Sequence, residues 1–303
     1  MPTALQTFTR ISSRDDDKPL NILCCPAHER YETGLAKTGH EFWAWQGSGI
    51  KPWKTEYAAF PENYHLLDGR LQDRQLPLFV DVDICFSHNR FAHFAIMQSI
   101  ARQLQVPLIN LEHTLPPPNF NSSMLKYAKT MSGDVDVFIS DYSRKAWGWP
   151  ESDKVEIVHH GVDTELFKPD TSVARQDLVC SVVNDWMNRD WCCGFNLWRQ
   201  VTGWPETTLP INVWGDTPGL SKAADGVCGL VKEYQRSSIF LNTSLISPVP
   251  TVLLEAMSCG CAIVSTNNCM IPEFITHGEN GLLANDPREL RSERAQRHAD
   301  PAG

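Results

Sequence analysis

Short apolar runs that resemble buried strands alternate with helical patterns along almost the whole chain, and this alternation limits the folds open to it. Apolar runs of about four to eight residues bounded by turn-forming residues are typical of strands. Strands separated by helices pair in parallel, and right-handed crossovers place the helices on both faces of the sheet. The sequence therefore predicts an α/β protein of doubly wound parallel sheets.

The apolar runs form two series separated by a polar stretch, DTSVARQD, which follows Pro169. The first series is NILCCP, HEFWAW, DICFSH, PLINLEH, DVFIS and VEIVHH, and the second is DLVCSVV, INVWGD, SIFLNTS, CAIVSTN and NGLLAND. A chain of 303 residues that is 42% hydrophobic can fill two cores. We predict two domains, 1–168 and 169–303, with the active site in the cleft between their sheets, where ligands meet the carboxyl ends of strands.

Charge and cysteine content exclude several classes of protein. A net charge of −9 argues against nucleic acid as a partner, because binding to its phosphates needs a basic surface. We find neither a signal peptide nor an apolar run of about 18 residues. The 10 cysteines match neither a disulfide framework nor zinc-ligand spacing, so we interpret most of them as small buried hydrophobic residues in a reducing cytoplasm. Dinucleotide, P-loop, zinc-protease and serine-hydrolase motifs are absent from the sequence.

The segment 250–283, PTVLLEAMSCGCAIVSTNNCMIPEFITHGENGLL, fits a helix-strand-helix unit around a bound phosphate. Proline is favoured at a helix start, so a helix should begin at Pro250 with unpaired backbone N–H groups at Thr251 and Val252. Such groups bind anions. Glu255 follows Thr251 by one turn, about 6 Å along the same face, which is the step from a diphosphate to its ribose.

Two blocks of this sequence resemble a known family. LLEAMSCGCAIVST, followed by IPEFI and GENGLL, and the earlier VEIVHHGVDTELFKP are similar to the retaining GT-B glycosyltransferases that include phosphatidylinositol mannosyltransferases and bacterial sucrose synthases, a family 4-like group. The resemblance implies two Rossmann-like domains facing a cleft. It also implies transfer of a hexose from a UDP- or GDP-sugar to an acceptor hydroxyl with retention of configuration, without metal or cofactor. The acceptor, a glycan, lipid or small molecule, stays open.

The resemblance also assigns donor-binding residues. Glu255 would be the second glutamate of an E-x7-E motif and hold the ribose, while Pro250, Thr251 and Val252 would surround the diphosphate. Ser247 stands where the family has the first glutamate, which touches the donor sugar. A hydroxyl there can still make one hydrogen bond, directly or through water.

Two further residues are catalytic candidates. Family members carry an arginine and a lysine after the first strand of the second domain, and the corresponding SVVNDWMNRDW leaves Arg189 as the candidate for the diphosphate. His113 ends the run PLINLEH and matches a histidine beside the donor sugar in that family. Without the resemblance, a histidine at a strand end is more often structural.

Other polar residues remain open between function and structure. His28, Arg30 and His88 end predicted strands or begin helices, so they either contact the acceptor or serve packing and solvation. The pairs Asp81/Asp83 and Asp134/Asp136 resemble the D-x-D metal site of another glycosyltransferase fold. Each pair leads directly into an apolar strand, so we interpret these aspartates as solvated and predict no metal site.

A basic stripe near the end of the chain, Arg288, Arg291, Arg294 and Arg297, is either a solvated helix face or a weak peripheral membrane contact. Two alternatives to transfer also remain. One is a nucleotide-sugar-binding protein with little or no transfer activity, and the other is a GT-B nucleotide-sugar epimerase.

Overall fold

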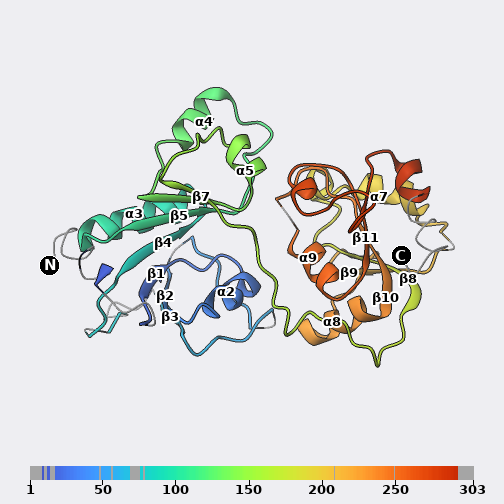
Figure 1. Ribbon diagram of the computed structural model, residues 1–303, viewed down its shortest axis with the longest axis horizontal. Helices are drawn as coiled ribbons and strands as arrows, with labels where there is room; N and C mark the ends of the chain where they lie inside the picture. Colours follow the sequence, from blue (N-terminus) through green and yellow to red (C-terminus); the bar gives the residue numbers. More distant parts are fainter. Residues whose placement is uncertain are drawn as a thin grey trace. The chain divides into compact units, whose positions relative to one another are not determined.

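The computed structural model describes residues 9, 12–13, 18–47, 49–55, 57–68, 76–77, 79–207, 209–248 and 250–292. The chain forms two compact units, Met1–His159 and His160–Gly303 (Figure 1). The second unit begins before the predicted boundary at 168/169, because the preceding residues bond to it. Ser258 Oγ donates to the carbonyl of Phe167, and Gln235 Nε2 donates to that of Lys168 at 2.9 Å.

The first unit contains a seven-stranded sheet in the order β3-β2-β1-β4-β5-β6-β7, and every neighbouring pair is parallel. Its strands are β1 (Asn21–Cys24), β2 (Glu41–Gln46), β3 (Tyr64–Asp68), β4 (Ile84–His88), β5 (Leu108–Glu112), β6 (Val135–Phe138) and β7 (Val155–Ile157). All six predicted strands are confirmed. The sequence analysis missed β3, which forms one edge of the sheet.

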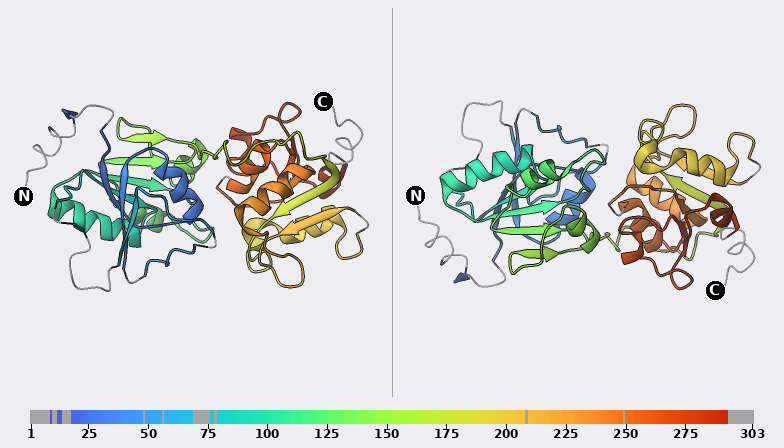
Figure 2. Two further views of the ribbon diagram at one scale, coloured as in Figure 1. Left: turned by 90° about the horizontal axis from the view of Figure 1, so that it is seen from below. Right: turned by 90° about the horizontal axis from the view of Figure 1, so that it is seen from above.

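Helices cover both faces of this sheet, as predicted (Figure 2). They are α2 (Glu29–Ala36), α3 (Ala92–Leu104), α4 (Ser122–Ala128) and α5 (Asp141–Ala146). Successive strand residues point to opposite faces, and two buried clusters follow this alternation. Leu23 shares one cluster with Phe94 of α3, whereas Cys24 shares the other with Ala36 of α2.

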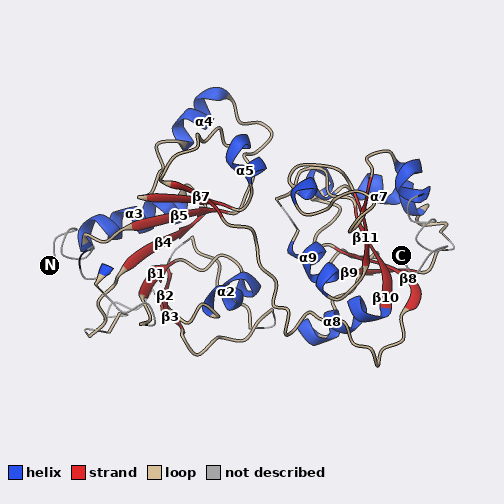
Figure 3. Cartoon of the chain, viewed as in Figure 1, coloured by secondary structure: helices blue, strands red, loops and turns tan. Residues whose placement is uncertain are grey.

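The second unit contains a five-stranded parallel sheet in the order β12-β11-β10-β8-β9. The strands are β8 (Gln176–Val182), β9 (Ile211–Trp214), β10 (Ser237–Asn242), β11 (Ala262–Ser265) and β12 (Leu282–Leu283). Each coincides with a predicted run, although β8 and β10 begin one residue before theirs. The helices are α6 (Asp190–Cys193), α7 (Phe195–Thr202), α8 (Gly226–Arg236), α9 (Thr251–Ser258) and the 3-10 turn η1 (Ile271–Glu273). Helices and strands are distinguished by colour in Figure 3.

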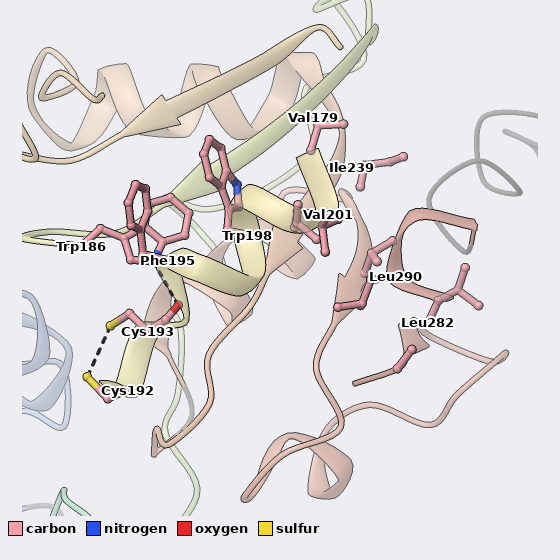
Figure 4. Close-up of a cluster of buried hydrophobic side chains, with 13 residues drawn as sticks. Val179, Trp186, Cys192, Cys193, Phe195, Trp198, Val201, Ile239, Leu282 and Leu290 are labelled. Carbon is pink, nitrogen blue, oxygen red and sulfur yellow. Dashed lines mark hydrogen bonds between the residues drawn. The ribbon is translucent and has the colours of Figure 1, made fainter. Parts of the chain in front are cut away.

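Tryptophans fill the core on the α7 side of this sheet (Figure 4). The rings of Trp186 and Trp198 lie 4.9 Å apart, and Trp198 packs in the same cluster as Val179 and Ile239. On the other face, Tyr234 of α8 contacts Phe240 of β10, with ring centroids 6.0 Å apart. The two-layered packing therefore matches the doubly wound arrangement expected from the sequence.

The cysteines behave as the sequence analysis predicted. All ten are free and eight of them are buried. Cys192 and Cys193 lie side by side, with sulfur atoms 3.6 Å apart (Figure 4). Burial raises the pKa of the Cys261 thiol to about 11, so this group stays protonated and unreactive at neutral pH.

The arginine stripe near the chain end is partly structural. Arg291 donates from Nε to the carbonyl of Val201 at 2.9 Å and from Nη2 to that of Gln200 at 2.8 Å, so it anchors the chain to α7. Arg294 and Arg297 lie outside the described residues. Within the described ranges, no helix combines the length and the apolar character that crossing a membrane requires.

Candidate functional site

The carboxyl edge of the second sheet brings two predicted site segments together. The loops after β8 and β10 carry Arg189 and Ser247, and these strands are neighbours in the sheet. The short helix α6 joins the loops, because Leu245 N–H donates to the carbonyl of Cys192 at 2.8 Å. A side chain at Gly194 would place its Cβ 2.0 Å from the carbonyl oxygen of Thr243, so only glycine permits this approach.

The start of α9 has the form that the proline pattern predicts. Pro250 precedes the helix in an extended conformation, with φ −63° and ψ 122°, and the helix begins at Thr251. Thr251 is exposed and Val252 is half-buried. Among the described residues, no side chain caps this end. The N–H of Leu253 donates to the carbonyl of Pro250 at 2.9 Å, so Thr251 and Val252 are the first-turn residues whose N–H groups could bind an anion, in the place that the sequence assigns to a diphosphate.

Glu255 lies one turn further along α9 and is buried. The residue is only 4% exposed, and the hydroxyl of Tyr234 donates to its Oε2 atom at 3.1 Å. Sequence reasoning missed Tyr234, which belongs to α8 and reaches Glu255 only through the tertiary fold.

Arg189 and Ser247 make local contacts in this structure. Arg189 is exposed, and its Nη1 atom donates to the carbonyl of Asn184 at 3.4 Å, within the same loop. The Ser247 hydroxyl donates to the carbonyl of the adjacent Pro248. The serine oxygen therefore remains able to accept a hydrogen bond, while its hydrogen is already used.

At the carboxyl edge of the first sheet, the fold brings His88 and His113 into contact. His88 ends β4 and His113 follows β5, and these strands are neighbours. Their Nδ1 and Nε2 atoms, respectively, lie 2.9 Å apart. On the other side, His88 Nε2 lies 3.4 Å from Oε1 of Glu32, a residue of α2 that the sequence analysis did not select.

The remaining acceptor-side candidates lie at the start of α2. His28 is exposed and precedes the helix, and its carbonyl accepts from the N–H groups of Tyr31 at 2.9 Å and Glu32 at 3.0 Å. Arg30 is half-buried in the first turn. Both residues therefore lie within about one turn before the buried Glu32, and their role toward an acceptor stays a prediction.

The interpretation of the aspartate pairs as solvated is wrong for Asp83 and Asp136, which are buried. Asp83 accepts from the backbone N–H of Asn21 at 2.9 Å. Asp136 pairs with the buried Arg90 at 3.1 Å, and Arg90 also pairs with Glu112 at 3.0 Å. These carboxylates fix strands and a buried guanidinium. These contacts are structural, because a charged group that is removed from water needs a partner that compensates for its lost hydration.

A shallow cavity of about 400 Å³ lies elsewhere in the second unit. It is lined by Trp214, residues 222–225, and Cys228, Gly229, Lys232 and Glu233 of α8. None of the predicted site residues lines this cavity. The candidate site therefore rests on the loops and the start of α9.

Comparison with protein families and solved structures identifies the fold. Residues 222–297 match the family described as "Glycosyl transferases group 1". A search of curated proteins finds no match. The chain is similar to Anabaena Alr3699/HepE in complex with UDP-glucose, with a TM-score of 0.68, 16% identity, and coverage of 93% of this chain and 90% of that one.

Two other solved structures are similar to nearly the same extent. Sucrose-phosphate synthase from Thermosynechococcus elongatus gives a TM-score of 0.67 at 13% identity, over 94% of this chain and 90% of that one. A glycosyltransferase from Rickettsia africae gives 0.65 at 14% identity, over 94% and 89%. The predicted GT-B fold and the family resemblance are therefore confirmed.

Proposed function

Since residues 222–297 match the family of group 1 glycosyl transferases and the chain has the GT-B fold, we propose that the protein is a glycosyltransferase. In this proposal it moves a hexose from a UDP- or GDP-sugar to an acceptor hydroxyl, with retention at the anomeric carbon and without a metal ion. The buried free thiols support a cytoplasmic location.

The observation that carries the proposal is the exposed start of α9, which no side chain of the described residues caps, in the unit that also contains the two joined loops. As the sugar leaves, negative charge develops on the departing diphosphate. The N–H groups at Thr251 and Val252 would stabilise that charge, and the guanidinium of the exposed Arg189 would add to them. In this account no general base is needed for departure, and His113 of the first unit borders the sugar.

The similar structures favour UDP as the nucleotide to examine first. The HepE structures are described in complex with UDP, with UDP-glucose, and with UDP and glucose. We therefore propose UDP-glucose as the first donor for assay, with GDP-sugars as the comparison. Removing divalent ions with a chelator should leave transfer unchanged.

Titration calorimetry with UDP and GDP tests the donor site. Replacing Glu255 by glutamine removes the charge that would hold the ribose hydroxyls, so UDP affinity should fall about tenfold. Glu279→Gln is the matched control, because Glu279 is an exposed glutamate of the same unit. Equal UDP affinity in wild type and Glu255→Gln would contradict the proposed ribose contact.

One observation favours a second function, nucleotide-sugar binding with little transfer. Ser247, at the position of the family's first glutamate, is uncharged, and its hydroxyl already donates to the carbonyl of Pro248. A radiolabelled UDP-glucose assay separates the two functions. Labelled product with glycan, lipid or small-molecule acceptors, or slow hydrolysis, supports the transferase. Tight binding with neither product supports the binding protein.

A further inference from the structure

Three side chains from different elements form a chain at the carboxyl edge of the first sheet. Glu32 of α2 lies 3.4 Å from His88 at the end of β4, and His88 lies 2.9 Å from His113 after β5. The side chains of Glu32 and His88 are 0% exposed, while His113 is half-buried. The chain therefore runs from a buried carboxylate to the imidazole proposed to border the donor sugar.

The two imidazoles meet edge to edge. Their planes differ by 15° and their centroids lie 5.2 Å apart. That separation exceeds the 2.9 Å between Nδ1 and Nε2 by about two ring radii, so the rings are nearly coplanar rather than stacked face to face. This is the geometry of a direct N–H···N hydrogen bond.

Neighbouring groups fix both rings in this plane. The ring of Tyr31 stands edge-on to His88 at 5.7 Å and to His113 at 4.5 Å. Phe86 meets His88 edge-on at 4.7 Å. Asn89 Oδ1 accepts from the backbone N–H of His113 at 3.1 Å. The position of His113 thus depends on residues of α2 and β4 as well as on its own loop.

The carboxylate determines where hydrogen sits along the chain. Burial alone would raise the pKa of Glu32, but the attraction to His88 and the N–H of Ala27, 2.8 Å from Oε1, outweigh it and lower this pKa. Glu32 is therefore ionised, and the His88 nitrogen that faces it must carry hydrogen. The Nδ1 atom of His88 and the Nε2 atom of His113 share one hydrogen across their 2.9 Å contact, so the hydrogen position on His88 determines the tautomer of His113.

We propose that Glu32 and His88 are positioning residues that fix the ring plane and the tautomer of His113 beside the donor sugar. This inference rests on the proposed function, because it assigns His113 to that sugar. Neither Glu32 nor His88 touches the substrate in this account. They act through His113, in the way that a group bonded to the far nitrogen of a metal-binding histidine fixes the orientation and tautomer of that ring.

A metal ion is the competing explanation for the same cluster. Cys24 Sγ, a Glu32 oxygen and a His88 nitrogen lie within 4.8 Å of one another. However, Glu32 Oε1 already accepts from Ala27, and Cys24 Sγ lies 3.8 Å from the hydroxyl of Tyr64. The contacts favour the chain of Glu32, His88 and His113 over a metal site.

A double-mutant cycle tests the positioning role. Glu32→Gln should lower kcat for UDP-glucose turnover on the order of tenfold to a hundredfold, because the histidine ring is misplaced, with the UDP dissociation constant unchanged. In a His113→Ala background the same substitution should have little further effect. A full, additive loss in that background would overturn the inference, as would unchanged kcat in Glu32→Gln.

A matched control pair lies in the same unit. His65 Nε2 contacts Glu41 Oε2 at 2.8 Å, but both side chains are more than a third exposed. Glu41→Gln removes a similar carboxylate–imidazole contact away from His113 and should leave kcat unchanged. Glu32→Asp keeps the charge and should restore part of the activity lost in Glu32→Gln. If Glu32→Gln fails to fold, Glu32→Asp replaces it in the kinetic comparison, and a kcat equal to that of wild type would then overturn the inference.

Nitrogen NMR of labelled histidines provides a readout that does not need activity. Glu32→Gln should shift the ring-nitrogen signals of His113, and Glu41→Gln should not. Unchanged His113 signals would overturn the inference even if UDP binds, whereas absence of UDP binding would overturn only the proposed function. One equivalent of tightly bound metal, lost in Glu32→Gln, would also overturn the inference, because His88 Nε2 would then be a ligand.

Discussion

The two sheets end in carboxyl edges that are organised differently. In the first unit, the candidate groups are side chains bonded to one another in the interior, with Glu32 and His88 fully buried. In the second unit, the main candidates are the exposed backbone at the start of α9 and the exposed side chain of Arg189. One edge holds an imidazole among buried partners, and the other exposes backbone N–H groups.

This difference has a physical reason. An imidazole has two distinct nitrogens, and its neighbours decide which one carries hydrogen. A histidine that must keep one tautomer and one orientation therefore needs partners that are themselves held in place by burial. A helix N-terminus is oriented by the helix itself and needs only exposure. Substitutions of buried charges should therefore affect the first unit most, while backbone geometry should matter most in the second.

The largest effect is expected from the buried arginine of the first unit. Arg90→Met leaves Glu112 and Asp136 buried without their partner, and we expect a loss of about 3–5 kcal/mol in the free energy of unfolding. Hydrogen exchange of amides in β4, β5 and β6 measures it. Lys145→Met, which breaks an exposed ion pair with Asp141, should cost less than about 1 kcal/mol. Equal losses of unfolding free energy in Arg90→Met and Lys145→Met would contradict the larger role of buried charges in the first unit.

A backbone substitution should have the next largest effect, in the second unit. Gly194 has a φ of +67° and no room for a Cβ beside the Thr243 carbonyl, so Gly194→Ala should destabilise this unit by about 3 kcal/mol. Gly219 also has a positive φ, +74°, but open space around it, so Gly219→Ala should cost about 1–2 kcal/mol. Urea unfolding followed by hydrogen exchange of β8 and β10 amides compares them, and similar losses would show that the loop contact is unimportant.

The exposed cation should contribute less. Arg189→Gln should weaken UDP binding about fivefold at low salt, because a solvated guanidinium adds only about 1 kcal/mol to phosphate binding. The difference should shrink as salt is added. Calorimetry at two ionic strengths measures it, with the exposed Arg288→Gln as control. If Arg288→Gln weakens binding equally, general attraction rather than a specific contact is responsible.

The smallest effect concerns pH and the first unit. The pKa of Glu32 is lowered in the folded protein, so its ionised form stabilises the fold above the ordinary carboxyl range, and this stabilisation is lost as pH falls through the folded pKa. Hydrogen exchange of β1 and β4 amides should therefore show a stability difference between wild type and Glu32→Gln near neutral pH that narrows in acid. A difference independent of pH would contradict the ionised state.

Local patterns predicted much of the fold and of the second edge. Apolar runs identified the strands except β3, whose sequence YHLLD has only a short apolar stretch and gains its place by pairing with β2. The start of α9 followed from Pro250, because proline fixes its own backbone and precedes helices for local reasons. Such features depend on residues near one another in the chain.

Contacts between distant residues explain what the sequence analysis missed. An acidic residue in the first turn of a helix usually faces solvent, so Glu32 gave no signal, and its partner His88 lies on a different element. The sequence analysis interpreted Asp136 as solvated because its buried partner, Arg90, follows β4, whereas Asp136 lies in β6. Tyr234 reaches Glu255 in the same non-local way.

The most direct test of the account is a crystal structure of the chain with UDP bound. We predict diphosphate oxygens within hydrogen-bond distance of the Thr251 and Val252 N–H groups, with the ribose hydroxyls at Glu255. UDP lodged elsewhere, for example in the cavity beside Lys222, with the start of α9 empty, would contradict the account.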